Sequence, residues 1–465
     1  MKNSKREDKE YEGKKEFREC MKEAIKSSLS YLKRKSEREQ IIPFLEYDFE
    51  IDVNKRSWKT VPKLRFPLAL FVEKNLEEIL KLAEVASCID FMVKNEFHKM
   101  IEMEITDKNG KIVKAVETIK KFLGDNILGG FLKRYVETIG GFNYDENTFN
   151  NLYRELEEYI YTEGREIIVV APLLNFELKG VERIDLGDFI IRKINEEELK
   201  ILLGKGALNE HHFYPYGGFL KTIWCIELKV KFPSKMRRED LTPYIERIMT
   251  ALRLFKKGSI YYSAILSYPK IWRDIWIISS HERGKAYGQY YELTDEDVEN
   301  LKTFWSKFKS LNIQNYQFLD VAIRRFNFSY ERKLSEDKLI DYITAFEALY
   351  LKGVEKELGY RLALRCACFL GKDGEERKKI FEILKSAYDA RSKIVHGKPI
   401  ESKSFKKLLN KLNLNLPELS MQVEEYLRES IKTFLHSLQK SNLQKSKSHD
   451  KIIKEIDEKI ITGFG

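Results

Sequence analysis

An arginine and a histidine stand five positions apart at the end of one predicted helix. They are Arg391 and His396, in the stretch YDARSKIVHGKP at 388–399. Apolar residues of this helix recur every three, four or seven positions, at Ile380, Leu384, Ala387 and Ile394. Arg391 occupies the place in that series where an apolar residue belongs. A guanidinium stabilises negative charge and an imidazole transfers protons, so the two side chains have the chemistry of an acid–base site for an anionic substrate.

The cation on the apolar stripe allows two interpretations. Burying an unpaired charge costs roughly several kcal/mol, so Arg391 needs either a carboxylate partner inside the helical bundle or a wet cleft. His396 is followed by Gly397 and Pro399, which are typical of a helix end. Carbonyl dipoles at a helix C-terminus favour a protonated imidazole. The histidine therefore favours the cleft without excluding the ion pair.

The spacing of the two residues predicts how a site must be assembled. Five residues correspond to about 140° of rotation and ~7.5 Å of rise, so Arg391 and His396 do not share one helix face. They converge either because arginine is long and the helix ends at the histidine, or because two copies of the helix meet across a two-fold axis. The second arrangement predicts a homodimer with a composite site.

The elements that must position this pair form a helical bundle. Five or six amphipathic helices are predicted over 296–440, with no strand-like alternation. The preceding region, 41–295, is mixed α/β, with a helix at 75–104, glycine-rich loops at 124–141, and strands at 42–53, 165–178, 181–194 and 222–232. A charged segment, 1–40, begins the chain, and a Lys- and Ser-rich tail, 441–465, is expected to be mobile. The predicted fold class is α+β.

Composition limits the class of protein. The chain has 465 residues and a formal net charge of +10, which permits a polyanionic partner but does not require one. An odd number of scattered cysteines, five in all, argues against disulfides and a structural zinc site. No signal peptide or membrane-spanning segment is predicted, so we expect a cytoplasmic protein without membrane association. His211 and His212 are interpreted as part of a surface loop, and we expect no metal or cofactor.

The residues around the arginine resemble a known family. R-x-x-x-x-H inside YDARSKIVHG is similar to the signature of HEPN domains. Three upstream segments, RRFNFSYER, KLIDYITAFEALYL and ELGYRLALRCACFLG, resemble the Apea-like HEPN branch in order and spacing. The resemblance covers roughly residues 315–436. The resemblance implies that the C-terminal region is a HEPN helical bundle.

The resemblance implies a site and a reaction. Active members of the family dimerise and cleave RNA without metal, and Arg391 and His396 match the two catalytic positions. Ser392 is assigned a supporting role. An acidic residue on an earlier helix is expected to assist, with Glu347 the first candidate and Asp341 the second; the alternative is ordinary helix carboxylates paired with arginines such as those at 361 and 365.

Basic residues near the motif are candidates for contacts with RNA phosphates. They are Arg324, Arg325, Lys393 and Lys398, with Arg332 a weaker candidate, and the alternative is a solvated helix face. The predicted function is a metal-independent endoribonuclease of a defence or stress-response system. The N-terminal region is expected to act as its sensor or regulator and to bind an unknown trigger molecule. Two alternatives are a non-catalytic HEPN module for RNA binding or dimerisation, and an interaction protein in which Arg391 forms a core ion pair.

Overall fold

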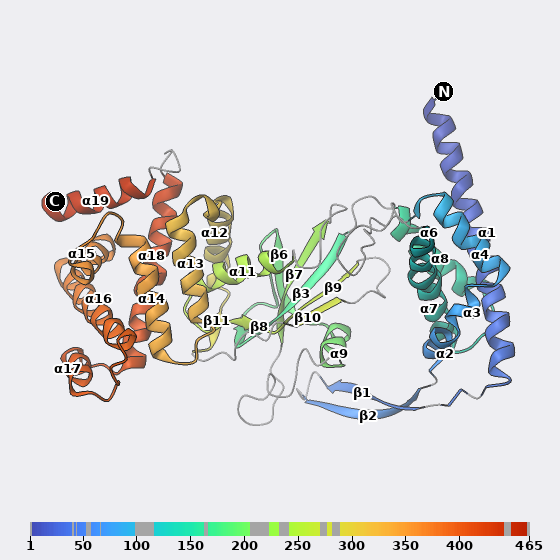
Figure 1. Ribbon diagram of the computed structural model, residues 1–465, viewed down its shortest axis with the longest axis horizontal. Helices are drawn as coiled ribbons and strands as arrows, with labels where there is room; N and C mark the ends of the chain where they lie inside the picture. The colour runs from blue at the N-terminus through green and yellow to red at the C-terminus, as the bar shows by residue number, and fades with distance from the viewer. Residues whose placement is uncertain are drawn as a thin grey trace.

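The computed structural model describes residues 2–462 with internal gaps. The gaps are 40, 43, 53–56, 66, 98–115, 162–165, 205–222, 232–240, 270–276, 281–288 and 441–447. Figure 1 shows a central sheet with N-terminal helices at one end and the C-terminal helices at the other. The described part of the chain is therefore α+β with a helical C-terminal region, as predicted.

The N-terminal helices enclose a hydrophobic core of their own. They are α1 (Lys2–Ser36), α2 (Leu68–Lys74), α3 (Leu76–Ile79), α4 (Ala83–Lys94), α6 (Val116–Leu123), α7 (Gly129–Ile139) and α8 (Glu146–Tyr161). The charged segment at 1–40 belongs to this core through α1, because Phe17, Met21 and Leu29 are buried in it. The single helix predicted for 75–104 is divided into α3 and α4, and residues 98–104 lie outside the described residues.

The glycines at 124 and 129 are helix residues, which corrects the prediction of loops at 124–141. A π-helical turn, Gly124–Leu128, joins α6 to α7. A Cβ atom at Gly124 would lie 2.9 Å from Leu80 Cδ2, and one at Gly129 would lie 3.1 Å from Leu76 Cδ2. These glycines therefore allow close helix packing instead of making turns. Only near the end of the segment does Gly140, with φ 72°, end α7 in the left-handed region.

The central sheet is antiparallel and has strands within the ranges predicted at 165–178, 181–194 and 222–232. The first two ranges each contain two strands instead of one, because Asn175 and Gly187 interrupt them with φ of 56° and 84°. Its order is β10-β9-β3-β7-β6-β5, with β8 also paired to β3. The bounds are β3 Glu166–Leu174, β5 Arg183–Asp185, β6 Phe189–Lys193, β7 Trp224–Lys231, β8 Tyr261–Tyr262, β9 Ala264–Pro269 and β10 Ile277–Ser280. One face packs on α9 (Glu196–Gly204) and the other on α11 (Thr242–Phe255). Separate pairs are the antiparallel hairpin β1–β2 (Phe44–Asp52, Ser57–Arg65) and the parallel pair β4–β11 (Phe176–Leu178, Tyr291–Leu293).

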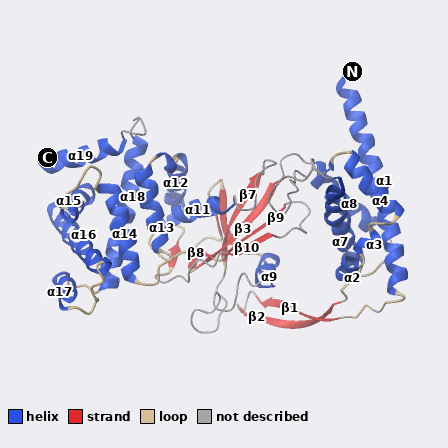
Figure 2. Cartoon of the chain, in the orientation of Figure 1, coloured by secondary structure: helices blue, strands red, loops and turns tan. Residues whose placement is uncertain are grey.

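The C-terminal helices form the bundle that carries the predicted site (Figure 2). They are α12 (Asp297–Ser310), α13 (Gln317–Ser329), α14 (Ser335–Tyr350), α15 (Leu358–Leu370), α16 (Gly374–Val395), α17 (Lys403–Leu412) and α18 (Leu416–Lys440). The sequence predicted all of these except the short α17. Their core is continuous with the α11 face of the sheet, so the predicted boundary at 295/296 falls inside one hydrophobic cluster. The bundle is thus anchored to the sheet.

The C-terminal tail contains a packed helix where mobility was expected. This is α19 (Ser448–Thr462), and Ile452, Ile453 and Ile456 are buried against the bundle. The Asp457 carboxylate accepts two hydrogen bonds from Arg365 of α15, at 2.8 and 2.7 Å. The Lys- and Ser-rich stretch before α19 is typical of a mobile tail, whereas the isoleucines within α19 recur at helical spacing and pack on the bundle.

Candidate functional site

Helix α16 places Arg391 on the side that faces the bundle. Asp373 caps its N-terminus by accepting a hydrogen bond from the Glu376 amide at 2.8 Å. The predicted apolar stripe is confirmed: Ile380, Leu384 and Ala387 are buried, and Ile394 packs partly buried against the core. Arg391 continues this stripe one turn before the helix ends.

Arg391 is paired with the carboxylate that was the first candidate. Its Nη2 donates to Oε2 of Glu347 on α14 at 3.3 Å, and each side chain is 25% exposed. Among the described residues, Arg391 Nε is buried and has no hydrogen-bond partner. A guanidinium has five N–H donors, so this hydrogen bonding is incomplete. The arrangement combines the two interpretations: a carboxylate partner within one bundle and partial contact with solvent.

A tyrosine that the sequence analysis did not select completes this group. Tyr388 lies close to Glu347, and burial together with the Glu347 charge raises the pKa of Tyr388. Its ring packs on Gly359 of α15, where a Cβ atom would lie 2.7 Å from Cδ1 of the ring. Tyr388 precedes Arg391 by three residues, a spacing that puts both on one helix face and could have revealed it.

His396 sits at the exposed C-terminal end of α16. It is the C-cap residue, with φ −85° and ψ 14°, and Gly397 follows in the left-handed region at φ 69°. The Gly397 amide donates to Ile394 O and the Lys398 amide to Lys393 O, both at 2.9 Å. These two bonds are those of a Schellman motif, so the backbone at His396 is fixed while its side chain is open to solvent.

The remaining motif residues surround the same helix end. Ser392 and Lys393 are half-buried, and Lys398 is exposed. The Ser392 carbonyl accepts from the His396 amide at 3.1 Å. Within the described chain no hydrogen bond joins Arg391 to His396, which agrees with the expected separation of their faces. The end of α16 is therefore a basic surface with one accessible imidazole.

Asp341 belongs to a different group, although it is on the same helix as Glu347. Its carboxylate accepts from Arg325 Nη1 at 3.1 Å and Arg332 Nε at 2.9 Å, and its side chain is only 2% exposed. Six residues on α14 separate the two acids by about 240°, so they point to different sides of the helix. The structure does not bring Asp341 or Arg325 together with Arg391.

Arg324 is also placed away from this group. It lies on α13, exposed, with its Nη2 3.8 Å from Asp320. It lines a shallow cavity of about 250 Å³ together with Glu246, Asp320 and Glu331. Three carboxylates beside it make this surface a poor match for phosphate. Of the four basic candidates, Lys393 and Lys398 are the two close to His396.

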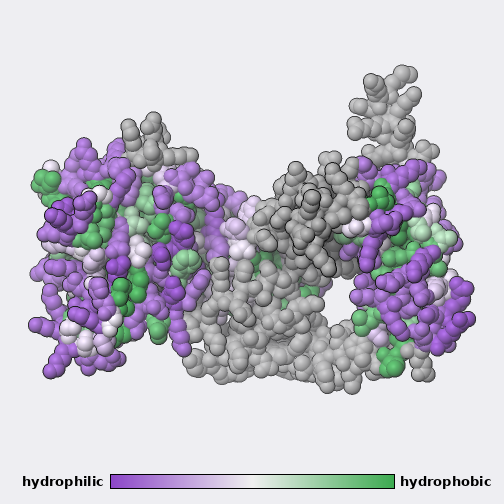
Figure 3. Space-filling model, in the orientation of Figure 1, coloured by the Kyte–Doolittle hydropathy of each residue, from purple (hydrophilic) through white to green (hydrophobic). Residues whose placement is uncertain are grey.

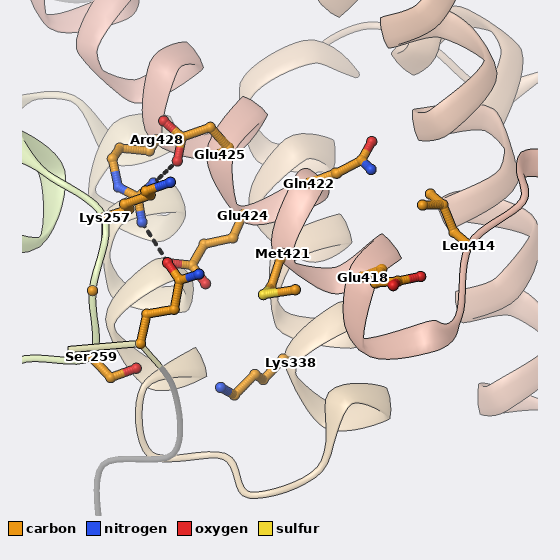
Figure 4. A pocket seen from close by; sticks show the side chains of 12 residues that line it. Lys257, Ser259, Lys338, Leu414, Glu418, Met421, Gln422, Glu424, Glu425 and Arg428 are labelled. Carbon is orange, nitrogen blue, oxygen red and sulfur yellow. Dashed lines mark hydrogen bonds and ion pairs between the residues drawn. The ribbon is translucent and has the colours of Figure 1, made fainter. Parts of the chain in front are cut away.

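A larger cavity lies at the seam between the sheet and the bundle. It has a volume of about 760 Å³ and is bounded by the loop at 257–259, Lys338 of α14 and one face of α18. Figure 4 shows Arg428 at its edge, held by Glu424 and Glu425. None of the R-x-x-x-x-H residues lines it. The exposed end of α16, not this cavity, carries the candidate chemistry.

The described ranges contain neither a metal-binding group of side chains nor a membrane-spanning helix. No group of three or more His, Cys, Asp or Glu side chains there could hold a metal ion. His211 and His212 lie outside the described residues. None of the described helices has both the length and the apolarity to cross a bilayer. The visible face of the bundle is largely hydrophilic, with scattered apolar side chains (Figure 3).

Comparisons with known proteins do not assign a family. No protein-family model matches the chain, and neither the curated proteins nor the solved structures include a significant match.

Proposed function

We propose that the chain is a metal-independent endoribonuclease of the HEPN type. The observation that carries the proposal is the incomplete hydrogen bonding of Arg391. A cation lies on the core stripe of α16, a quarter exposed, with one 3.3 Å contact and, within the described chain, an unpartnered Nε. A purely structural arginine would be expected to have its donors satisfied. The open donors are instead suited to an anionic group, and an exposed histidine follows at the end of the helix.

The reaction follows from the chemistry of RNA. The 2′-oxygen attacks the adjacent phosphorus as its proton passes to a base, and the bond to the 5′-oxygen breaks as that oxygen receives a proton. His396 serves one of these proton transfers. The Arg391 guanidinium stabilises the negative charge that builds on the phosphoryl oxygens. Glu347 orients Arg391 through their hydrogen bond, and Ser392 has a supporting role.

The proposed enzyme is a homodimer, because one copy separates Arg391 and His396 on the helix. A two-fold axis near the end of α16 would bring an arginine from one subunit toward a histidine of the other. The setting proposed for such a nuclease is a defence or stress response, with the N-terminal region sensing an unknown trigger. Light scattering at micromolar concentration tests the dimer, and an active monomer would contradict it.

One observation favours a second candidate function. Arg391 and Glu347 form their ion pair within a single bundle, which is also how a structural pair is built. A HEPN-type module that binds RNA or dimerises without cleaving it would keep this pair. In that case RNA binding would persist and no cleavage would be detected.

The test is cleavage of single-stranded RNA in the presence of EDTA. The wild type should produce fragments ending in 2′,3′-cyclic phosphate or 3′-phosphate, and His396→Ala should lose most of the activity. His436→Ala is a matched control, because His436 is an exposed histidine on α18 of the same bundle. Fragments with 3′-hydroxyl ends, or activity that requires added metal, would contradict the proposal.

A further inference from the structure

Two cysteines of the N-terminal helices lie in contact. Cys20 is on α1 and Cys88 is on α4, and these two helices pack directly against each other (Figure 1). The Phe17–Phe91 ring pair, with centroids 6.2 Å apart, and the Ser27 Oγ–Glu84 Oε2 hydrogen bond at 2.8 Å lie on either side of them along the helix contact, so Cys20 and Cys88 face each other. Neither is in a disulfide. Cys20 is partly exposed, whereas Cys88 is fully buried in the core of this region. The partly exposed sulfur of Cys20 therefore lies beside the buried sulfur of Cys88.

The two sulfurs differ in character. The hydrogen bond with Cys88 lowers the pKa of the Cys20 thiol, so Cys20 has more thiolate than an ordinary cysteine. The same hydrogen bond, together with burial, raises the pKa of Cys88 well above its ordinary value. Sensor cysteines combine thiolate character, exposure and a neighbouring thiol that resolves the oxidised form.

We propose that Cys20 and Cys88 are an oxidation site for hydroperoxides, at which Cys20 reacts and Cys88 resolves the product to a disulfide between α1 and α4. This site is independent of the nuclease proposed for the C-terminal bundle. Its substrate class is a small peroxide, because Cys20 is only partly exposed and a bulky oxidant would have poor access.

The chemistry balances with peroxide as the oxidant. The Cys20 thiolate attacks one peroxide oxygen; an S–O bond forms, the O–O bond breaks, and hydroxide leaves and takes a proton to become water. The Cys88 sulfur then attacks Sγ of Cys20; the S–S bond forms, the S–O bond breaks, and the leaving hydroxide takes the Cys88 proton. Two thiols lose two electrons in all, and hydrogen peroxide is reduced to two waters.

The other cysteines provide a contrast within the same chain. Cys368 is also partly exposed, but burial raises its pKa. Cys366 is two residues before it on α15 and buried, with its sulfur directed to Ser430. Residues two apart on a helix point to different faces, so this pair cannot form an unstrained disulfide. Cys368 is therefore a matched control for exposure without activation.

The experiment treats the full-length wild-type chain with a small excess of hydrogen peroxide and maps thiols by mass spectrometry. We expect a peptide cross-link between Cys20 and Cys88, with loss of both thiols and reversal by dithiothreitol. Before oxidation, iodoacetamide should alkylate Cys20 ahead of Cys368. With Cys88→Ala, dimedone should trap a sulfenic acid at Cys20 and no cross-link should form.

Two results would overturn the proposal. One is the absence of the Cys20–Cys88 cross-link in the wild type while Cys20 remains a free thiol after peroxide treatment. The other is alkylation and oxidation of Cys368 at the same rate as Cys20. Both are read on the wild-type chain, so the test does not depend on whether Cys88→Ala folds.

Discussion

Two arginines of one helical bundle, Arg391 and Arg428, have opposite surroundings. Arg428 on α18 has a side chain 2% exposed and uses all three nitrogens: Nε donates to Arg253 O at 2.8 Å, Nη1 to Glu425, and Nη2 to Glu424 and Tyr330 Oη. Arg391 on α16 is a quarter exposed and makes one contact, to Glu347.

The difference separates a structural role from a chemical one. Burying a guanidinium requires that its donors be satisfied, and Arg428 meets this condition at the seam of sheet and bundle. Arg391 does not, although it interrupts an apolar stripe where a leucine would pack better. A residue that weakens packing without a complete set of partners is a candidate for function.

The largest expected effect is on cleavage. Arg391→Ala and His396→Ala should each lower the rate of RNA cleavage by roughly a hundred- to ten-thousand-fold, the usual contribution of one general acid–base group. The double variant should be little slower than the worse single variant, because both side chains act on one transition state. Independent, multiplicative losses would show that the two residues do not share a site.

The next effect is on folding and concerns the other arginine. Arg428→Ala should lower the free energy of unfolding by about 3–5 kcal/mol, since it removes the cation paired with Glu424 and the donor to the Arg253 carbonyl. Urea titration followed by circular dichroism measures this. A loss below about 1 kcal/mol would mean that a saturated network is no guide to structural importance in this bundle.

A smaller effect concerns phosphate contacts around Arg391. Replacing Lys393 and Lys398 by alanine together should weaken RNA binding and reduce the slope of log affinity against log salt by about 2, or ~1 for each lysine. Lys379→Ala is the control, an exposed lysine about 18 Å away along α16. Equal effects at Lys379 would indicate a diffuse basic surface.

The smallest effect is a pH dependence of α19 docking. His449 stacks on Phe318 at a ring-centroid distance of 3.8 Å, its Nε2 lies 2.8 Å from Leu349 O, and burial lowers its pKa below the ordinary 6.5. The unfolded chain then binds more protons than the folded one below about pH 6.5, so stability should fall as pH falls through that range. Unfolding titrations between pH 5 and 8, which span roughly the range where histidine titrates, should show a flatter slope for His449→Gln. Identical slopes for the wild type and His449→Gln would show that His449 does not cause the pH dependence of stability.

Regular patterns were predictable from the sequence, and their exceptions were not. The 3.6-residue repeat located the long bundle helices, and alternation located the strands at 166–174 and 224–231. Helix α19 was not predicted because the Lys- and Ser-rich stretch before its isoleucines is typical of a mobile tail. Gly124 and Gly129 were interpreted as loop residues because close helix packing leaves no local signal.

The sequence also could not decide which of two carboxylates on α14 pairs with Arg391. Glu347 and Asp341 lie on one helix, and only the fold reveals that Arg325 and Arg332 surround Asp341 while Arg391 reaches Glu347. Arg361 and Arg365 were also open as partners, but Arg365 binds Asp457 of the unpredicted α19. Long-range pairing of this kind depends on tertiary contacts that no local pattern encodes.

The most direct test measures two quantities on one preparation of Arg391→Ala, the free energy of unfolding and the rate of single-stranded RNA cleavage in EDTA. Removal of Arg391, which is a quarter exposed and makes one hydrogen bond among the described residues, should cost no more than about 1 kcal/mol of stability. The account predicts this small loss together with a cleavage rate lowered at least ~100-fold. A loss of about 3–5 kcal/mol, as for a broken buried pair, with cleavage unchanged would contradict it.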